Sequence, residues 1–174
     1  MRVLEVTAAD FECHVAGLAE LLHDCVAGGA SVSFISPFSP AEAAAFWQKK
    51  VRARLGRPRF CQWLFLVDGE VAGTVLLDAD LPPNQPHRGE VSKLLVSPRF
   101  RRRGIARQLM AALEQKARDW RLTLLTLDTA TGSHAEPLYL SLGFEVAGVI
   151  PQFALAVDGS HYDATTVMYK RLSG

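Results

Sequence analysis

A chain of 174 residues, 49% hydrophobic and 21% charged, is long enough to bury a core of its own, so we expect one domain spanning residues 1–174. Its 19 basic and 18 acidic residues leave a net charge of +1, which favours neither nucleic acid nor an anionic membrane as a partner. Three cysteines without C-x-x-C spacing argue against a disulfide framework or a thiolate zinc site, and with no apolar leader or membrane span we expect a cytoplasmic protein.

The first third of the chain predicts one strand and two helices. Residues 2–6 alternate between apolar and polar side chains, as a strand does, and apolar side chains over 11–25 recur every three or four positions, as on one face of a helix. Glycines at 28–29 end that helix. The segment 39–42 offers an N-cap, a proline at the first helical position and a capping-box acid, so a second helix is expected from there to Gly56.

A hairpin and a loop follow the second helix. Residues 61–67 and 71–77 are apolar and rich in strand-forming residues, and Asp68-Gly69 between them is a strong hairpin signal. The segment 79–88 holds three prolines and continues neither strand nor helix. We therefore predict an antiparallel pair of strands and a surface loop that is long enough to act as a lid.

The middle of the chain predicts a crossover unit. Residues 90–96 form a strand ended by Ser97-Pro98, the apolar spacing over 105–119 indicates an amphipathic helix, and 122–127 is a second buried strand. If these two strands are parallel, their connection is expected to be right-handed. The unit places a helix beside a buried sheet.

The last part of the chain completes the predicted sheet. A short helix is expected at 135–142 with Gly143 as its cap, and apolar stretches follow at 144–150, 153–157 and 164–169. Together these elements predict an α+β fold with α/β/α layers, in which a mixed central sheet of about six to seven strands is flanked by helices.

The segment 101–106 lies between a buried strand and the start of a long helix, and it predicts an anion site. A helix N-terminus carries unpaired N–H groups and a partial positive charge, and Gly104 with the small Ala106 lets the backbone approach a phosphate. The alternative is a solvated basic turn. Neither a G-x-x-x-x-G-K-[ST] loop nor a G-x-G-x-x-G turn is present, which disfavours ATP and NAD as ligands.

At these residues the chain resembles the GNAT acetyltransferase family. Its pyrophosphate-binding motif, Q/R-x-x-G-x-G/A, is matched by Arg101, Gly104 and Ala106, and the similarity continues through 90–96 and 135–144 in the same order and spacing. The resemblance implies the GNAT fold, in which two neighbouring central strands splay apart around acetyl-CoA. It also implies direct transfer of the acetyl group to an amine without a metal.

In that family the first splayed strand pairs its free backbone groups with the pantetheine amides. The resemblance therefore implies that Leu95 and Val96 present backbone groups to acetyl-CoA, and that a bulge points an N–H at the thioester carbonyl. The cofactor-binding residues expected on this basis are Leu94, Leu95, Val96, Arg101, Arg102, Arg103, Gly104, Ile105, Ala106, Arg107 and Ser133. No metal is expected, because the five histidines are scattered without ligand spacing.

Acetyl transfer requires the departing thiolate to be protonated or stabilised. The resemblance places Tyr139, within the pattern A-x-x-L-Y-x-x-L-G-F, where related proteins keep a tyrosine near the CoA sulfur as a general acid. The alternative is a buried aromatic side chain without a catalytic role.

The acceptor amine must also lose a proton, and two carboxylates are candidates for the base. Glu90 opens a strand that is otherwise mainly apolar, and apolar surroundings raise the pKa of a carboxyl toward the operating pH. Asp128 ends the partner strand, so both can flank one opening and act through water. The alternatives are a strand-end acid facing water for Glu90 and a capping or turn role for Asp128.

The leading hypothesis is an enzyme that acetylates the primary amine of a small polar acceptor, such as an amino-acid-like antibiotic or toxin. We expect its acceptor pocket between the first two helices and the 79–88 loop. An acyl-CoA sensor without transfer activity is one alternative. A nucleic-acid-binding module is another, but the near-zero charge and the lack of interleaved aromatics do not support it. Neither nucleic acid nor membrane is an expected partner, and an apolar strand edge or helix can serve a homodimer.

Overall fold

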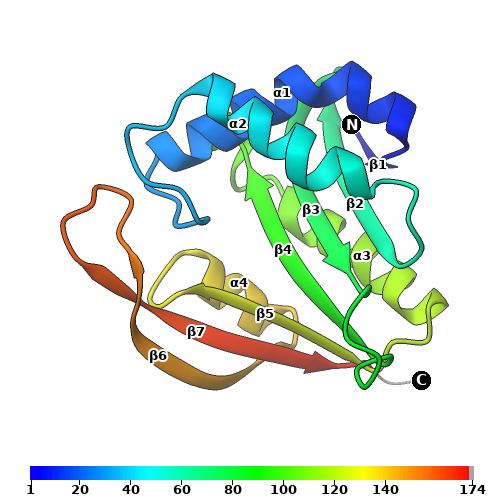
Figure 1. The fold of residues 1–174 in the computed structure, drawn as a ribbon. Coiled ribbons are helices and arrows are strands. Elements are labelled where there is room, and N and C mark those ends of the chain that lie inside the picture. The colour runs from blue at the N-terminus through cyan, green and yellow to red at the C-terminus, as the bar shows by residue number, and fades with distance from the viewer. Residues whose placement is uncertain (173–174) are drawn as a thin grey trace.

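The computed structural model describes residues 1–172 and places its strands in one mixed sheet (Figure 1). The order across the sheet is β1-β2-β3-β4-β5-β7-β6. In this described part of the chain, β4 and β5 are the only parallel neighbours, and the other pairs are antiparallel. The strands are β1 (Arg2–Glu5), β2 (Phe60–Val67), β3 (Glu70–Asp78), β4 (Arg88–Val96), β5 (Leu124–Ala130), β6 (Glu145–Leu155) and β7 (Tyr162–Arg171).

Helices cover both faces of the sheet, as the α/β/α prediction requires (Figure 1). The helices are α1 (Ala8–Ala27), α2 (Pro40–Phe46), α3 (Ile105–Asp119) and α4 (Ala135–Ser141). Buried side chains of α1 and α2 form one core with the sheet, and those of α3 and α4 form the other. Within residues 1–172, none of these helices is long and apolar enough to cross a membrane.

The second predicted helix is shorter than expected. Its start is confirmed, because Ser39 and Glu42 form the capping box at the head of α2. The chain then changes from α-helical bonding to a π-helical turn (Trp47–Val51) and a 3₁₀ turn (Arg52–Arg54). Trp47 is fully buried there, and its indole N–H donates to the carbonyl of Leu18 at 2.8 Å. This contact fastens α2 to α1.

Strand β4 carries a bulge and separates from β5. On one side Leu95 is opposite Thr74 and Ser92 is opposite Leu76, so two residues of β4 face one residue of β3. The bulge residue Lys93 has a left-handed φ of 51°. On the other side, pairing with β5 ends at Glu90. The rest of β4 therefore has a backbone edge without a strand partner in the described residues, which confirms the splayed central strands.

The end of the chain differs in detail from the prediction. The two apolar stretches expected at 144–150 and 153–157 are one long strand, β6, with an irregularity between Ile150 and Ala154. Pro151 is tolerated because β6 is an edge strand, where a missing N–H breaks no ladder. Strand β5 also begins later and extends further than the predicted 122–127.

Candidate active site

The candidate site lies where β4 and β5 diverge. Parallel strands end at the same edge of a sheet, so the segments after β4 and after β5 emerge together. The first leads into α3 and the second into α4. The sequence-predicted residues thus come from neighbouring elements, with Glu90 on β4, Asp128 on β5 and Tyr139 on α4.

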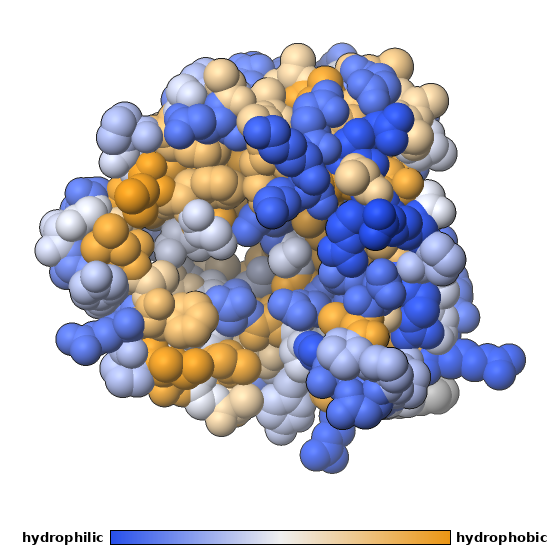
Figure 2. All heavy atoms as spheres, viewed as in Figure 1, coloured by the Kyte–Doolittle hydropathy of each residue, from blue (hydrophilic) through white to orange (hydrophobic). Residues whose placement is uncertain are grey.

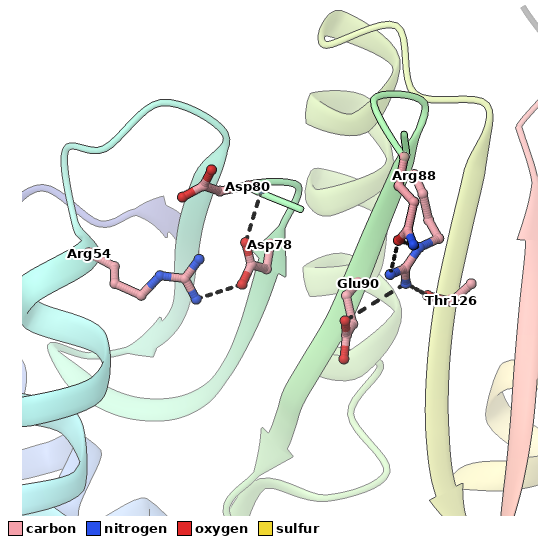
Figure 3. Close-up of polar contacts among 7 residues, drawn as sticks. Arg54, Asp78, Asp80, Arg88, Glu90 and Thr126 are labelled. Atoms are coloured by element: carbon pink, nitrogen blue, oxygen red, sulfur yellow. Dashed lines mark hydrogen bonds and ion pairs between the residues drawn. The ribbon is translucent and has the colours of Figure 1, made fainter. Parts of the chain in front are cut away.

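Glu90 lies in polar surroundings. Its side chain is 52% exposed, and its carboxylate is 3.8 Å from a guanidinium nitrogen of Arg88 (Figure 3). Arg88 also donates to the hydroxyl of Thr126 on β5 at 2.6 Å. The expectation of apolar surroundings for Glu90 is therefore wrong. Side chains two positions apart on a strand lie on the same face, so Arg88 lies beside Glu90.

Asp128 lies within β5 and does not turn the chain. It pairs in register with Val167 of β7, and its carboxylate accepts a hydrogen bond from the hydroxyl of Thr165 at 3.1 Å. Its negative charge also acts to raise the pKa of Tyr139 and of Lys93. Asp128 is therefore electrostatically coupled to the residue predicted as the acid and to the residue at the β4 bulge.

Tyr139 is buried on α4, and its ring makes an edge contact with Phe144 at 5.6 Å between centroids. Burial and then the charge of Asp128 raise the pKa of Tyr139 well above its ordinary value of 10.0. The phenol therefore keeps its proton over the whole neutral range. Residues 1–172 contain one fully buried side-chain oxygen or nitrogen without a hydrogen-bond partner, and it is not the hydroxyl oxygen of Tyr139. A buried tyrosine that holds its proton can serve as an acid.

The start of α3 has the geometry of an anion site. Gly104 precedes the helix in the left-handed region, with φ 75°, and no side chain of residues 1–172 caps the first turn. The first N–H groups of α3 therefore remain available. Arg101, Arg102 and Arg103 stand exposed beside them, with the Arg101 guanidinium near Gly28 at the end of α1. Their positive charge adds to that of the helix end.

The remaining residues predicted to bind the cofactor differ in their burial and in their contacts. Leu95 and Ile105 are buried, so only their backbone groups can meet a ligand. Leu94, Val96, Ala106 and Ser133 are partly exposed, and the hydroxyl of Ser133 lies 3.0 Å from that of Thr129. Arg107 donates to the hydroxyl of Ser141 at 2.8 Å. This hydrogen bond ties α3 to α4, so Arg107 has a structural partner within the protein.

A cavity of about 220 Å³ opens beside the bulge on the α2 side of the sheet. It is lined by Phe46, Lys50, Val51, Arg54, Phe60, Leu76, Asp78, Ser92 and Lys93. A larger cavity of about 570 Å³ adjoins it over the segment between α1 and α2 and shares Phe46 and Lys50 with it. The 79–88 loop lines neither cavity, so its expected place in the acceptor pocket is not seen. Within residues 1–172, no three potential ligands are grouped to hold a metal ion.

Sequence reasoning missed Lys93. Its ammonium donates to the carbonyl of Val32 at 3.1 Å and lies 5.8 and 5.6 Å from the ring centroids of Phe34 and Phe46. Burial lowers the pKa of this lysine, and the charge of Asp128 offsets part of the shift. One signal was present in the sequence, since Lys93 is the only charged residue between Val91 and Val96.

Comparisons with known proteins indicate one enzyme family. A model described as the acetyltransferase (GNAT) family matches residues 18–144. An uncharacterised N-acetyltransferase of Lactobacillus delbrueckii subsp. lactis is 31% identical over 114 residues, which cover 60% of this chain and 66% of that protein. The L-amino acid N-acetyltransferase AaaT of Escherichia coli K12 is 27% identical over 127 residues, 72% of this chain and 75% of that protein.

A solved structure extends the similarity to the whole fold. The putative acetyltransferase yncA of Salmonella typhimurium, determined with its cofactor acetyl-CoA, superposes with a TM-score of 0.77 at 20% identity. The superposition covers 100% of this chain and 95% of that chain. At this identity the likeness concerns the fold alone.

Proposed function

The chain belongs to the acetyltransferase (GNAT) family, and on this premise we propose that it transfers the acetyl group of acetyl-CoA directly to a primary amine of a small polar acceptor. One observation carries the proposal. The unpaired edge of β4, with its bulge at Lys93, leads through 101–104 to the uncapped start of α3. Free backbone groups and a helix N-terminus thus follow one another along one path.

This path fits the parts of acetyl-CoA. Amides need backbone partners, which the free edge of β4 at 94–96 offers, and a pyrophosphate needs N–H groups and positive charge, which the start of α3 and the arginines at 101–103 offer. When bound, acetyl-CoA supplies an acetyl group activated as a thioester. The protein's own part is to align the acceptor and to move protons.

We propose Tyr139 as the residue that donates a proton to the leaving sulfur. It holds its proton at Oη throughout the neutral range, because burial raises its pKa, so a proton is present at this position when the sulfur departs. Glu90 and Asp128 are the proposed proton acceptors for the amine, directly or through water. Glu90 is exposed next to the cavity lined by Ser92, and Asp128 is coupled to Tyr139.

A closer resemblance supports an amino-acid-like acceptor. Over most of its length the chain resembles the tabtoxin-resistance acetyltransferase, with matches at 28–32, 107–110 and 127–129. In that protein the acids matching Glu90 and Asp128 are the proposed bases, and the tyrosine matching Tyr139 is the proposed acid. An antibiotic or toxin that carries an amino acid would suit such a site.

We also propose that the chain forms a homodimer through β6. This strand is one of the two edges of the sheet, and its apolar side chains Val146, Val149, Ile150 and Phe153 are exposed. Figure 2 shows apolar surface at the lower left of the molecule, where Figure 1 places β6 and β7. A long, exposed, apolar edge strand can pair with a strand of another chain. Sedimentation equilibrium tests this, since a monomer at all concentrations would contradict it.

We propose a cytoplasmic location on the basis of the cysteines. Cys13, Cys25 and Cys61 are all free thiols in the structure. Free thiols persist in reducing compartments.

Release of CoA from acetyl-CoA tests the proposed activity. We expect release to depend on the added amine and to yield an N-acetylated product by mass spectrometry. Binding of acetyl-CoA without release with any amine would instead favour the acyl-CoA sensor.

A further inference from the structure

The smaller cavity beside the β4 bulge carries an excess of positive charge. Three cationic side chains line it, Lys50, Arg54 and Lys93, against one carboxylate, Asp78. Arg54 and Asp78 form an ion pair with each other (Figure 3). Among residues 1–172, neither Lys50 nor Lys93 has a carboxylate within 4.0 Å. Lys50 and Lys93 therefore line this space without an ion-pair partner in the described residues, and the carboxylate of Asp128 acts on Lys93 only from beyond ion-pair distance.

Lys93 is held in one position. Its ammonium donates to the carbonyl of Val32 at 3.1 Å and lies 3.4 Å from the hydroxyl of Ser33, with the rings of Phe34 and Phe46 nearby. An ammonium has three N–H groups. Two are directed to these oxygens, and in residues 1–172 the third has no protein acceptor. A fixed ammonium with a free donor is suited to bind a carboxylate.

The position of this ammonium relates it to the reaction. Lys93 is itself the bulge residue of β4, and Ser92 before it lines the cavity. Glu90 shares a face of β4 with Ser92, and its register partner on β3 is Asp78, another lining residue. A short molecule in this cavity therefore lies beside the strand that carries both the proposed base Glu90 and Lys93.

We propose that Lys93, assisted by Lys50, binds a carboxylate of the acceptor, so that the acceptor is an α-amino acid or a molecule that carries one. The inference rests on the proposed function and names the substrate class of that same site. The ring of Phe46 in the cavity wall favours an acceptor with an apolar side chain, whereas the ring of Phe60 is covered by the guanidinium of Arg54 at 4.3 Å. The lowered pKa of Lys93 is consistent with this proposal, because burial disfavours the charged form of the lysine and a bound carboxylate would favour that form.

Matched acceptors provide the test. The proteinogenic L-α-amino acids are assayed beside their α-carboxamides, which keep the amine and the side chain but lack the negative charge of the α-carboxylate. For Lys93→Gln we expect kcat/KM to fall by about 10- to 100-fold with an amino acid, mainly through KM, the loss expected for one charged hydrogen bond. With the matching amide we expect it to change by less than about 2-fold.

Companion variants separate binding from folding. Lys93→Arg, which keeps the charge, is expected to recover part of the loss, and Lys50→Gln is expected to show a smaller loss that is again confined to the amino acid. Lys49→Gln serves as the matched control, because Lys49 precedes Lys50 in the chain but lines only the larger, adjoining cavity. Unfolding temperatures of all four variants check that they are folded.

The outcomes are distinct. If Lys93→Gln lowers kcat/KM equally for acids and amides, the lysine only holds the 32–34 segment in place and the inference is overturned. If the wild-type protein acetylates amides or other amines but no amino acid, the inference also fails while the acetyltransferase proposal stands. If no amine is acetylated, the proposed function itself fails.

Discussion

At the scale of single residues, Tyr139 makes the sharpest prediction. We expect Tyr139→Phe to lower kcat by about 10²-fold or more, because the departing sulfur loses its proton donor. Since the pKa of Tyr139 is raised above 10.0, its ionisation should produce no alkaline limb in the wild-type profile at neutral or mildly alkaline pH. Binding of acetyl-CoA should be unchanged, and an unchanged kcat would remove Tyr139 as the acid.

Glu90 and Asp128 can be separated by their pH profiles. We expect Glu90→Gln to flatten the acidic limb of kcat/KM, because that limb reports protonation of the base in the free enzyme. Glu70→Gln is the control, since Glu70 is paired with Arg99 at the far end of β3. If the limb persists in Glu90→Gln but is lost in Asp128→Asn, the base is Asp128.

The three thiols should differ in reactivity. Burial raises the pKa of Cys25, and burial together with Glu5 raises the pKa of Cys61 to about 12, while Cys13 is exposed. A raised pKa leaves less of the reactive thiolate. A thiol reagent at about pH 8 should therefore modify Cys13 quickly in the folded protein, and all three cysteines after unfolding. Rapid modification of Cys61 in the folded protein would contradict the described burial.

At the site, the sequence indicated which residues take part more readily than it indicated what surrounds each of them. Tyr139 lies within a long pattern, and its burial was one of the two alternatives open from the sequence. The surroundings of Glu90 depend on Arg88 and on Thr126 of β5, which the sequence does not place side by side. Lys93 gains its importance from a bulge, and a bulge depends on the register with β3, which no local pattern reveals.

At the scale of elements, the approach of β3 to β4 makes a stability prediction. A Cβ at Gly73 would lie 2.8 Å from the carbonyl oxygen of Leu95 and 3.0 Å from a methyl carbon of Ile105. Gly73→Ala should therefore lower the free energy of unfolding by about 1–3 kcal/mol through overpacking, as measured by urea denaturation.

Gly148→Ala is the matched control for this prediction. Gly148 also lies in a strand, but a Cβ there meets no atom of the described residues within 4 Å. We expect its free energy of unfolding to change by no more than about 0.5 kcal/mol. Equal effects of the two substitutions would show that Gly73 is not constrained by β4 and α3.

Elements with local signals were predicted well, and elements that depend on packing were not. The capping box at Ser39, the Asp68-Gly69 turn and the start of α3 after Gly104 all appear where the sequence places them. The π-helical turn at Trp47–Val51 was not foreseen, because periodicity alone does not distinguish it from a continued α-helix. Strand β6 continues through Pro151 because it lies at the edge of the sheet, and an edge is a property of the whole topology.

At the scale of the whole molecule, the strand order explains why the site exists. One parallel pair, β4 and β5, joins two antiparallel blocks, β1-β2-β3-β4 and β5-β7-β6. Pairing between the blocks is confined to the first residues of β4, so the blocks diverge toward the segments that precede α3 and α4. The sequence predicted a mixed sheet, but the divergence came from the family resemblance and required the register to be seen.

We propose that acetyl-CoA binds along the free edge of β4 and the start of α3, and thermal unfolding with and without acetyl-CoA is the decisive experiment. A ligand at about 100 times its Kd adds about 2.7 kcal/mol to the free energy of unfolding. For a domain of this size we therefore expect Tm to rise by about 5–10 °C with acetyl-CoA, and not with ATP, NAD or duplex DNA. A Tm that rises only with DNA, or with none of these ligands, would contradict binding of acetyl-CoA at this site.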